Sequence, residues 1–297
     1  MRVLLLGENG QLGWELRRSL ATLGLITALD YPQIDLTKLE QARRVIKRIK
    51  PQVIINATAY TSVNGAESEP EVALAINRDA PSIIAEEAKA LGAAFIHYST
   101  DYVFDGKKSE PYVETDLPNP VNTYGQSKLA GEHEITNIGG TYLILRTSWL
   151  YSLRGETFVN KVLKWSRQYE TLRIVEDQVG SPTWCRMLAE ATAQVLVMGG
   201  VELVGWLAER RGLYHLAGEG YVSRYEWAQE ILRYNPNPQE QVTRHVLPSL
   251  TSEFPTPAQR PLFSALNCDR FYKTFGICLP DWRDALRLAL DYPDTGS

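Results

Sequence analysis

The stretch VLLLGENGQLG, residues 3–13, decides the fold of this 297-residue chain. Residues 3–6 form a short, continuous apolar run, which is typical of a strand buried on both faces of a sheet. Glycines follow at Gly7, Gly10 and Gly13, and an apolar pattern with a helical period continues to residue 23. A strand, a glycine turn and a helix in this order predict the start of a parallel sheet, with a phosphate site at the helix N-terminus.

The same alternation continues through the first 150 residues. Further strands are predicted at the apolar run ending at Asp30 and at 53–55, 94–98 and 142–145, with helices at 38–49, 69–91 and 124–136 between them. This alternation predicts an α/β fold with a doubly wound parallel sheet of the Rossmann type, which binds ligands at the carboxyl ends of its strands. We therefore expect residues 1–150 to form a dinucleotide-binding domain, completed by a helix and a strand within 184–217.

After residue 150 the alternation loosens. Helical patterns at 157–167, 184–197, 224–232 and 282–290 are separated by loops, and Pro-rich segments lie at 235–238 and 254–261. We expect residues 151–183 and 218–297 to form a smaller, mainly C-terminal lobe that binds the substrate.

The bulk composition excludes several classes of partner. A net charge of −4 argues against a nucleic-acid partner, which favours a basic surface. The most apolar later stretch, 188–208, contains Glu190 and Glu202 and does not predict a membrane span. The cysteines are few and scattered, with no disulfide or metal spacing, so we expect a cytoplasmic protein with no membrane partner.

The glycine turn and Asp30 together predict a dinucleotide site. Glycines allow a close backbone approach to a pyrophosphate, and an acidic residue at the end of the second strand can accept the ribose hydroxyls. Asp30 favours NADH, because its charge would oppose a 2′-phosphate, but NADPH remains open. The small residues at 56–61 after the third strand would let a cofactor pass, whereas Asp35 serves equally well as a helix cap.

The chemical end of the site is predicted from a second group of residues. Tyr124 and Lys128 lie four positions apart in a predicted helix and so share one face. An unperturbed tyrosine titrates near ~10, and a neighbouring ammonium is expected to lower the pKa of Tyr124 and make it a better proton donor. Thr100, at the end of the fourth strand, offers a hydroxyl to a carbonyl oxygen.

In this order, the glycine turn, Thr100 and Tyr124-x-x-x-Lys128 resemble the extended short-chain dehydrogenase/reductase superfamily. Longer blocks are similar to the dTDP-4-dehydrorhamnose reductase family. They are GQLGWEL (10–16), STDYVF (99–104), YGxxKLAGE (124–132), LRTSW (145–149), DQxGSPT (177–183) and PTPAxRP (255–261). The resemblance therefore covers almost the whole chain.

The resemblance implies an NAD(P)H-dependent oxidoreductase that reduces the C4 ketone of dTDP-4-dehydro-β-L-rhamnose to dTDP-L-rhamnose, the last step of dTDP-rhamnose biosynthesis. Hydride would come from NADPH or NADH and the proton from Tyr124, while Thr100 polarises the carbonyl and Lys128 holds the nicotinamide ribose. Residues 177–183 would wall the nucleotide pocket.

The expected site residues follow from these two lines of reasoning. The catalytic residues are Tyr124, Lys128 and Thr100. The cofactor-binding residues are Gly7, Gly10, Gln11, Leu12, Gly13, Asp30, Asp35, Leu36, Ala59, Tyr60, Thr61, Tyr98, Tyr124 and Lys128. The substrate-binding residues are Val63, Thr100, Asp101 and Trp149 at the sugar and Arg260 at the diphosphate.

One departure from the family concerns a metal. Some members bind Mg²⁺ through glutamates at a dimer contact, and Glu15 matches one of these. Arg186 stands where those members place another glutamate, and a cation cannot replace a carboxylate ligand. We therefore expect no metal site, with Glu15 an exposed helix residue; a homodimer stays open.

Two alternative functions remain at this point. A nucleotide-sugar epimerase or dehydratase shares the turn, the threonine and the Tyr/Lys pair, but an epimerase consumes no added cofactor, and a dehydratase needs an acidic residue where Tyr102 follows Asp101. A non-catalytic regulatory subunit of methionine adenosyltransferase also resembles this family. Co-purification with an adenosyltransferase, without reductase turnover, would favour that function.

Overall fold

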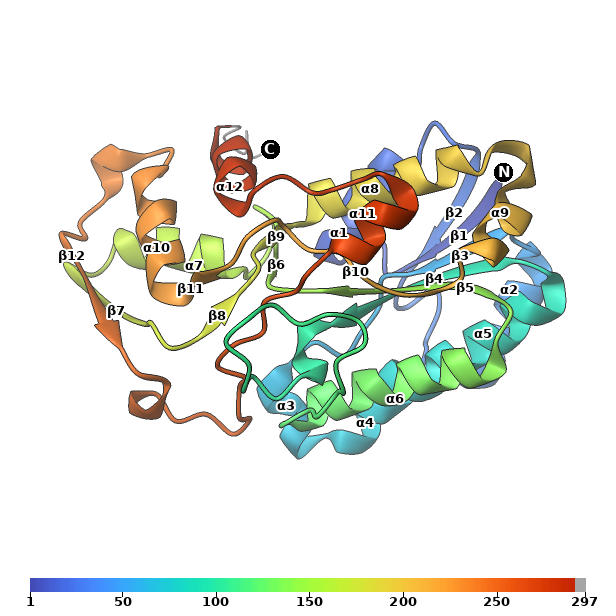
Figure 1. Cartoon of the computed structure of the whole chain (residues 1–297), viewed down its shortest axis with the longest axis horizontal. Coiled ribbons are helices and arrows are strands. Elements are labelled where there is room, and N and C mark those ends of the chain that lie inside the picture. Colours follow the sequence, from blue (N-terminus) through green and yellow to red (C-terminus); the bar gives the residue numbers. More distant parts are fainter. Residues whose placement is uncertain (292–297) are drawn as a thin grey trace.

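The computed structural model describes residues 1–291, and its centre is a six-stranded, wholly parallel sheet (Figure 1). The strand order is β10-β5-β4-β3-β1-β2, with β1 at Arg2–Leu6, β2 at Leu25–Leu29, β3 at Val53–Asn56, β4 at Ala94–Thr100, β5 at Thr141–Thr147 and β10 at Gly212–His215. This arrangement confirms the predicted doubly wound parallel sheet. The central strands are fully buried because helices cover both faces.

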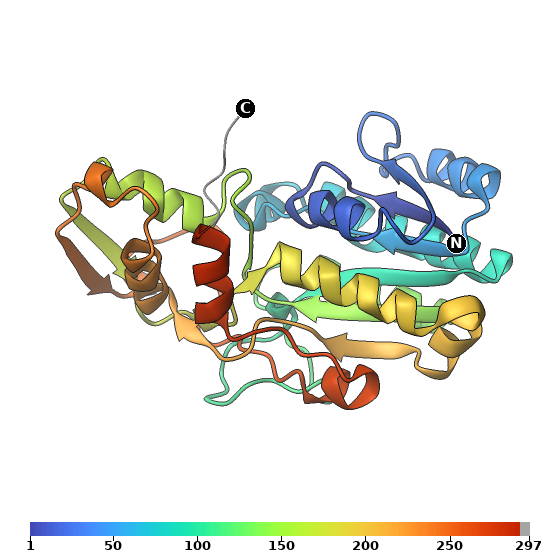
Figure 2. The same ribbon diagram turned by 90° about the horizontal axis from the view of Figure 1, so that it is seen from above.

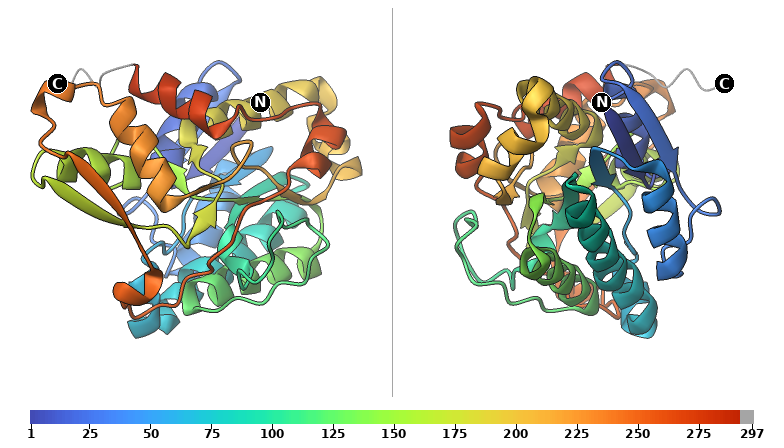
Figure 3. Two further views of the ribbon diagram at one scale, coloured as in Figure 1. Left: turned by 60° about the vertical axis from the view of Figure 1, so that its left-hand side comes forward. Right: turned by 90° about the vertical axis from the view of Figure 1, so that its right-hand side faces the viewer.

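The helices form two layers around the sheet (Figure 3). One layer contains α1 (Gln11–Ser19), α8 (Cys185–Met198), α9 (Leu203–Glu209) and α11 (Asp269–Phe275), whose apolar residues share one core cluster with β1, β3, β4 and β5. The other contains α2 (Leu39–Ile49), α5 (Ala80–Leu91) and α6 (Thr123–Ile138), which pack on the opposite face. The alternating side chains of each buried strand supply both clusters.

The helix predicted at 69–91 is confirmed over residues 70–91, but it contains a π-helical turn that the sequence did not predict. The chain forms α3 (Val63–Ser68), α4 (Pro70–Leu74), a π-helical turn η1 (Ala75–Asp79) and then α5. In η1 the buried Asn77 binds both the N–H and the C=O of Tyr60 and donates to the Ser127 hydroxyl. A methyl group on Gly131 would lie 2.1 Å from the Asn77 oxygen, so the turn depends on close packing against α6.

A smaller lobe lies beside the sheet, at the left of Figure 1 and Figure 2. Its strand pairs are β6 (Leu150–Tyr151) with β9 (Thr183–Trp184), β7 (Thr171–Val175) with β12 (His245–Ser249), and β8 (Val179–Gly180) with β11 (Val222–Ser223). Its helices are α7 (Phe158–Ser166), α10 (Arg224–Arg233) and α12 (Trp282–Leu290). Elsewhere and in the lobe the chain also forms short 3₁₀ turns, namely η2 (Asp101–Val103), η3 (Gly200–Glu202), η4 (Pro238–Glu240) and η5 (Thr251–Glu253). The lobe has its own core around Tyr151, Trp227 and Trp282.

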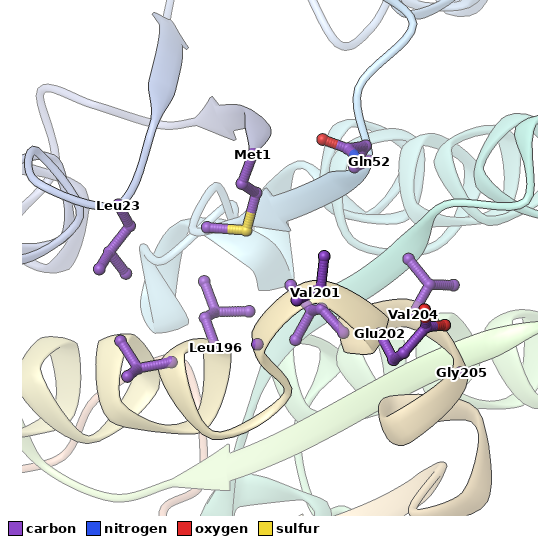
Figure 4. Close-up of a pocket in the computed structure, with 11 residues that line it drawn as sticks. Met1, Leu23, Gln52, Leu196, Val201, Glu202, Val204 and Gly205 are labelled. Carbon is purple, nitrogen blue, oxygen red and sulfur yellow. The ribbon is translucent and has the colours of Figure 1, made fainter.

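A groove lined by apolar and polar side chains lies between the N-terminus and the turn from α8 to α9 (Figure 4). Met1, Leu196 and Val201 line it, and Val201 is fully exposed.

Within residues 1–291 no single helix is long and apolar enough to cross a membrane. The segments 185–198 and 200–209 pass that test only as a pair, and they are bent by 104°.

A buried ion pair ties α6 to the sheet. Glu132 accepts from the Arg146 guanidinium at 2.9 and 2.6 Å and from the Ser99 hydroxyl at 2.5 Å. Both side chains of the pair are 3% exposed. The bidentate geometry, together with the serine, satisfies the carboxylate inside the protein.

The substitution Glu132→Gln should lower the free energy of unfolding by about 3–5 kcal/mol, because it leaves the Arg146 charge buried without its partner. Denaturant unfolding measures this loss. The matched control is Glu134→Gln on the same helix, a side chain that accepts a long hydrogen bond of 3.4 Å from Ser82; it should change stability by less than about 0.5 kcal/mol. Equal losses in the two variants would contradict the role given to the pair.

Candidate active site

A cleft of about 890 Å³ opens at the carboxyl ends of β1 to β5. It is lined by the glycine turn, the loop after β3, the end of β4, one face of α6 and the residues that follow β5. This is where a doubly wound sheet places its ligands.

The glycine turn leaves room for a ligand and brings α1 close to β1. Gly7 has a φ of +89°, which favours glycine, and a methyl group there would lie 2.9 Å from the Ala57 backbone. A methyl group on Gly13 would lie 1.8 Å from the Gly7 oxygen. Gly10 precedes α1 without any side-chain cap, so the first N–H groups of the helix remain available to an anion. These features fit a dinucleotide pyrophosphate.

Asp30 connects the end of β2 to the glycine turn. Its carboxylate accepts from the Asn9 N–H at 3.0 Å and from the Tyr31 N–H at 2.8 Å. The side chain lines the cleft, where it can also accept ribose hydroxyls.

The expected cofactor residues divide into two groups. Those that line the cleft are Gly7, Gly10, Gln11, Leu12, Asp30, Ala59, Thr61, Tyr98, Tyr124 and Lys128. Gly13 and Tyr60 do not line it. Gly13 packs on Gly7, and the Tyr60 hydroxyl donates to Glu69.

Two further expected residues, Asp35 and Leu36, lie outside the cleft. Leu36 is in the core against α2, because its apolar side chain is more stable there. Asp35 accepts from the N–H and the hydroxyl of Thr37, which lowers the pKa of its carboxyl. Asp35 thus serves the turn before α2 instead of facing the cleft.

Tyr124 and Lys128 face the cleft from α6, as their spacing indicates. The helix begins after Asn122, whose side chain accepts from the Gly125 N–H. Burial raises the pKa of Tyr124, and the nearby Thr100 hydroxyl opposes that rise. Tyr124 is therefore a neutral phenol at physiological pH.

The amine of Lys128 is held by β4. It donates to the Tyr98 carbonyl at 2.7 Å and lies 3.1 Å from Nε2 of His97, and the side chain is 1% exposed. Burial lowers the pKa of Lys128 to about 8, although Glu132 opposes that shift. The expectation of a lowered pKa for Tyr124 was wrong, since burial dominates and the net pKa of Tyr124 is raised.

Thr100 and Asp101 form a buried hydrogen-bonded pair at the end of β4. The Thr100 hydroxyl donates to Asp101 and accepts from the Tyr102 N–H, both at 3.1 Å. The other Asp101 oxygen accepts from the hydroxyls of Ser148 at 2.9 Å and Ser264 at 2.5 Å. Burial raises the pKa of Asp101, and these hydroxyls oppose the rise. Asp101 thereby fixes the position of Thr100.

The remaining expected substrate residues, Val63, Trp149 and Arg260, also line the cleft. The Trp149 ring stacks on Trp227 with a centroid distance of 5.6 Å. Arg260 donates to the Asn64 side chain at 3.3 Å. The cleft thus has an aromatic face and a cation where a sugar diphosphate was expected to lie.

Sequence reasoning missed two arginines of the cleft, Arg154 and Arg224. Arg224 begins α10, and its guanidinium carbon lies 3.5 Å from the centre of the Trp149 ring. Burial lowers the pKa of Arg224 to about 10, which still leaves it charged. No pattern in the sequence distinguishes Arg224 from an exposed residue in a first helical turn.

A second pocket of about 760 Å³ adjoins the cleft in the lobe. Aromatic side chains line it, namely Phe158, Trp165, Tyr169 and Phe254, together with Gln178 and residues of β7. Arg224 and Arg260 line both the pocket and the cleft. Two cations therefore stand at the junction of the two spaces.

Glu15 is half-buried and not exposed as expected. Burial raises the pKa of Glu15, and Arg186 is the strongest of the cations that oppose the rise. Within residues 1–291, no three His, Cys, Asp or Glu side chains are grouped as metal ligands.

Comparisons with known proteins point to one family. The family model described as RmlD substrate binding domain matches residues 1–293. The chain is 42% identical to a dTDP-4-dehydrorhamnose reductase of Burkholderia thailandensis, with 98% of each chain covered, and 38% identical to that of Escherichia coli strain K12, with 98% of this chain and 97% of the relative covered.

Solved structures agree with the sequence comparison. A dTDP-4-dehydrorhamnose reductase from Clostridium acetobutylicum has a TM-score of 0.89 at 33% identity, covering 98% of this chain and 99% of its own. The enzyme from Bacillus anthracis, solved in complex with NADP, has a TM-score of 0.86 at 34% identity, covering 98% of both chains. A UDP-glucose 4-epimerase from Thermus thermophilus, at 20% identity and a TM-score of 0.78 with 98% of both chains covered, shares the fold alone.

The substitution Gly13→Ala should destabilise the protein by about 1–3 kcal/mol and weaken dinucleotide binding, because the new methyl group forces α1 away from the Gly7 carbonyl. Thermal unfolding and a fluorescence titration with NADPH measure the two effects. Gly10→Ala is the control for stability, since its methyl group would lie 3.4 Å from the same oxygen. A Gly13→Ala protein with unchanged stability and affinity would refute this account of the turn.

Proposed function

The chain belongs to the RmlD family of dTDP-4-dehydrorhamnose reductases, and we propose that it reduces the C4 ketone of dTDP-4-dehydro-β-L-rhamnose with NADPH or NADH, using Tyr124 as the proton donor. The product is dTDP-L-rhamnose, so the reaction would be the last step of dTDP-rhamnose biosynthesis. The observation that carries the proposal is that Thr100, Tyr124 and Lys128 line one cleft with the glycine turn, in a chain 42% identical to a named reductase.

The reduction needs a hydride, which the bound dinucleotide supplies, and a proton, which the chain supplies. Tyr124 is neutral because burial raises its pKa, so its O–H is available to the ketone oxygen as negative charge develops there. Thr100 polarises the same carbonyl from the end of β4. The positive charge of Lys128 on the same helix face stabilises the tyrosinate after the proton has left. In this mechanism Lys128 also holds the nicotinamide ribose.

We further propose that the nucleotide of the substrate extends into the lobe. Arg224 and Arg260 suit a diphosphate, because guanidinium groups bind phosphate oxygens through two donors at once. The aromatic pocket beyond them suits a pyrimidine base, with Gln178 of the 177–183 segment at its wall. Val63, Asp101 and Trp149 would then surround the deoxysugar.

We propose the cellular location and the domain organisation of the protein from fewer observations. Three free cysteines and the absence of a single membrane-spanning helix among residues 1–291 support a cytoplasmic protein. We assign residues 1–150, with the helix and strand within 184–217, to the dinucleotide-binding domain, and residues 151–183 and 218–291 to the substrate-binding lobe, except α11, which packs on the sheet. Residues 292–297, also expected in the lobe, lie outside the described residues. A homodimer is compatible with this assignment.

The direct test uses dTDP-4-dehydro-6-deoxyglucose with the 3,5-epimerase that converts it to the ketone substrate. We expect the purified protein to oxidise one NADPH or NADH for each dTDP-L-rhamnose detected by NMR. Tyr124→Phe should lower turnover by ~10²–10⁴-fold while the affinity for the dinucleotide remains, because only the proton donor is removed. Turnover without net cofactor oxidation would instead indicate an epimerase, and near-normal turnover of Tyr124→Phe would exclude it as the donor.

Replacing Arg224 by methionine should raise the KM for the nucleotide sugar by roughly 10- to 100-fold, because a charge-assisted phosphate contact is lost. Steady-state kinetics at fixed NADPH measures this change. Arg233→Met on the same helix is the matched control, since that side chain is 69% exposed and pairs with Glu230. An Arg224→Met enzyme with the KM of the control would show that the diphosphate lies elsewhere.

A further inference from the structure

Three fully buried polar side chains lie in a row behind the cleft. Asn56 ends β3, His97 lies beside it in β4, and Lys128 reaches them from α6; their exposed fractions are 0%, 0% and 1%. Asn56 and His97 do not line the cleft, and the mechanism above gives them no part. Buried polar groups are costly unless each is hydrogen-bonded, so the direction of each hydrogen bond matters here.

The orientation of the Asn56 amide is fixed by Thr58. The Asn56 Oδ1 atom accepts from the Thr58 backbone N–H at 3.1 Å and from the Thr58 hydroxyl at 2.5 Å. A backbone N–H can only donate, so the oxygen of the amide must face Thr58. The Nδ2 atom therefore faces His97, where it donates to Nδ1 at 3.2 Å.

The tautomer of His97 follows from that contact. Burial, with a further contribution from Lys128, lowers the pKa of His97 well below its usual value, so the ring is neutral. A neutral imidazole has one donor and one acceptor nitrogen. Because Nδ1 accepts from Asn56, the proton is on Nε2, the atom that lies 3.1 Å from the amine of Lys128.

The two protonation states of Lys128 meet this N–H differently. A neutral amine can donate to the Tyr98 carbonyl and accept the His97 N–H with its lone pair, so both contacts are satisfied. An ammonium has no lone pair, and its N–H would oppose that of His97.

The other groups near Lys128 are accounted for. On its own helix are the neutral Tyr124 and Glu132, and Glu132 favours the ammonium but is neutralised by Arg146 of β5. On β4 the Tyr98 phenol is directed away, to Thr192. None of these groups offers the Lys128 ammonium a hydrogen-bond acceptor in place of Nε2 of His97, which already carries a proton.

We propose that Asn56 and His97 are positioning residues: Asn56 holds His97 in its Nε2–H tautomer, and this N–H favours the neutral amine of Lys128 over the ammonium. The consequence for catalysis rests on the proposed function. After Tyr124 has given its proton away, an N–H bond of the Lys128 ammonium breaks, the phenol O–H forms again, and the lone pair left on the amine accepts the His97 N–H. Lys128 then regains a proton from water in the open cleft.

The first test observes the tautomer directly in the protein as purified. The ¹⁵N chemical shifts of the His97 ring distinguish a protonated nitrogen from an unprotonated one, and His97→Gln identifies its signals. We expect a neutral ring with the proton on Nε2. A proton on Nδ1, or on both nitrogens, would overturn the proposal.

The second test removes the hydrogen bond that holds the tautomer. In Asn56→Leu the donor to Nδ1 is lost, and in Asn56→Asp a carboxylate accepts from Nδ1–H instead. Either change lets Nε2 accept from the Lys128 ammonium. The titration midpoint of Lys128, followed by the ¹³C shift of its ε-carbon and assigned with Lys128→Met, should rise by roughly one pH unit. Because Leu adds no charge, its effect isolates the tautomer from simple charge attraction.

The matched control is His215→Gln. His215 is also fully buried and neutral, but it contacts the Tyr112 carbonyl and not Lys128. This variant should leave the Lys128 midpoint unchanged even if stability falls. A midpoint that moves equally in the control, or that stays constant in both folded Asn56 variants, would refute the proposal.

Activity gives a third and separate readout. The alkaline limb of kcat/KM should move to higher pH in the Asn56 variants, because the ammonium then persists above the pH at which wild-type Lys128 loses its proton. If the protein proved inactive on the dTDP-sugar, the proposed function would fail while the two NMR tests still decided the role of Asn56 and His97. If the Lys128 midpoint measured by NMR moves but the alkaline limb of kcat/KM does not, the proposed proton transfer from Lys128 to Tyr124 is overturned.

Discussion

The ion pair between Glu132 and Arg146 determines where α6 lies, and the position of α6 determines the chemistry of the cleft. Glu132 lies one helical turn beyond Lys128 on α6. Because its carboxylate is bound to Arg146 of β5, the ion pair also fixes how deeply Lys128 is buried. Gly131 and Gly125 allow the approach, since methyl groups there would lie 2.1 Å from the backbone oxygens of Asn77 and Tyr102. The helix is thus clamped between the sheet, η1 and η2, and Tyr124 has little freedom in where it meets a substrate.

Burial disfavours the charged form of both Tyr124 and Lys128. It raises the pKa of Tyr124 and lowers that of Lys128, so each neutral form is favoured. The simple picture of a cation that makes its neighbouring phenol more acidic is therefore incomplete. In the proposed mechanism the positive charge of Lys128 acts after the phenol has lost its proton, when it stabilises the tyrosinate as a counter-charge.

The sequence predicted the central sheet well because its strands and helices differ in period. A continuous apolar run of four residues predicts the buried strand β1, and α12 was predicted with the bounds it has. The π-helical turn η1 inside the predicted helix could not be predicted, because it depends on packing between Asn77 and Gly131, 54 positions apart in the sequence numbering. The two-residue strands of the lobe are too short to show a period. Arg224 was missed for a similar reason, since its burial is due to Trp149, which is distant in the sequence.

The segment 262–265 returns from the lobe to pack against the loops after β4. Ser264 donates to Asp101, Ala265 accepts from the Tyr112 N–H, and the backbone of Leu262 lies so close to Gly106 that a methyl group there would be 2.5 Å away. During synthesis the sheet strands up to β5 therefore leave the ribosome long before the residue that fixes Asp101 does. A nascent chain can fold its glycine turn early, but its Asp101 carboxylate gains the Ser264 hydroxyl only after more than a hundred further residues have followed β5. The order of emergence thus delays the hydrogen bonding of Asp101 until long after the strands β1 to β5 have been made.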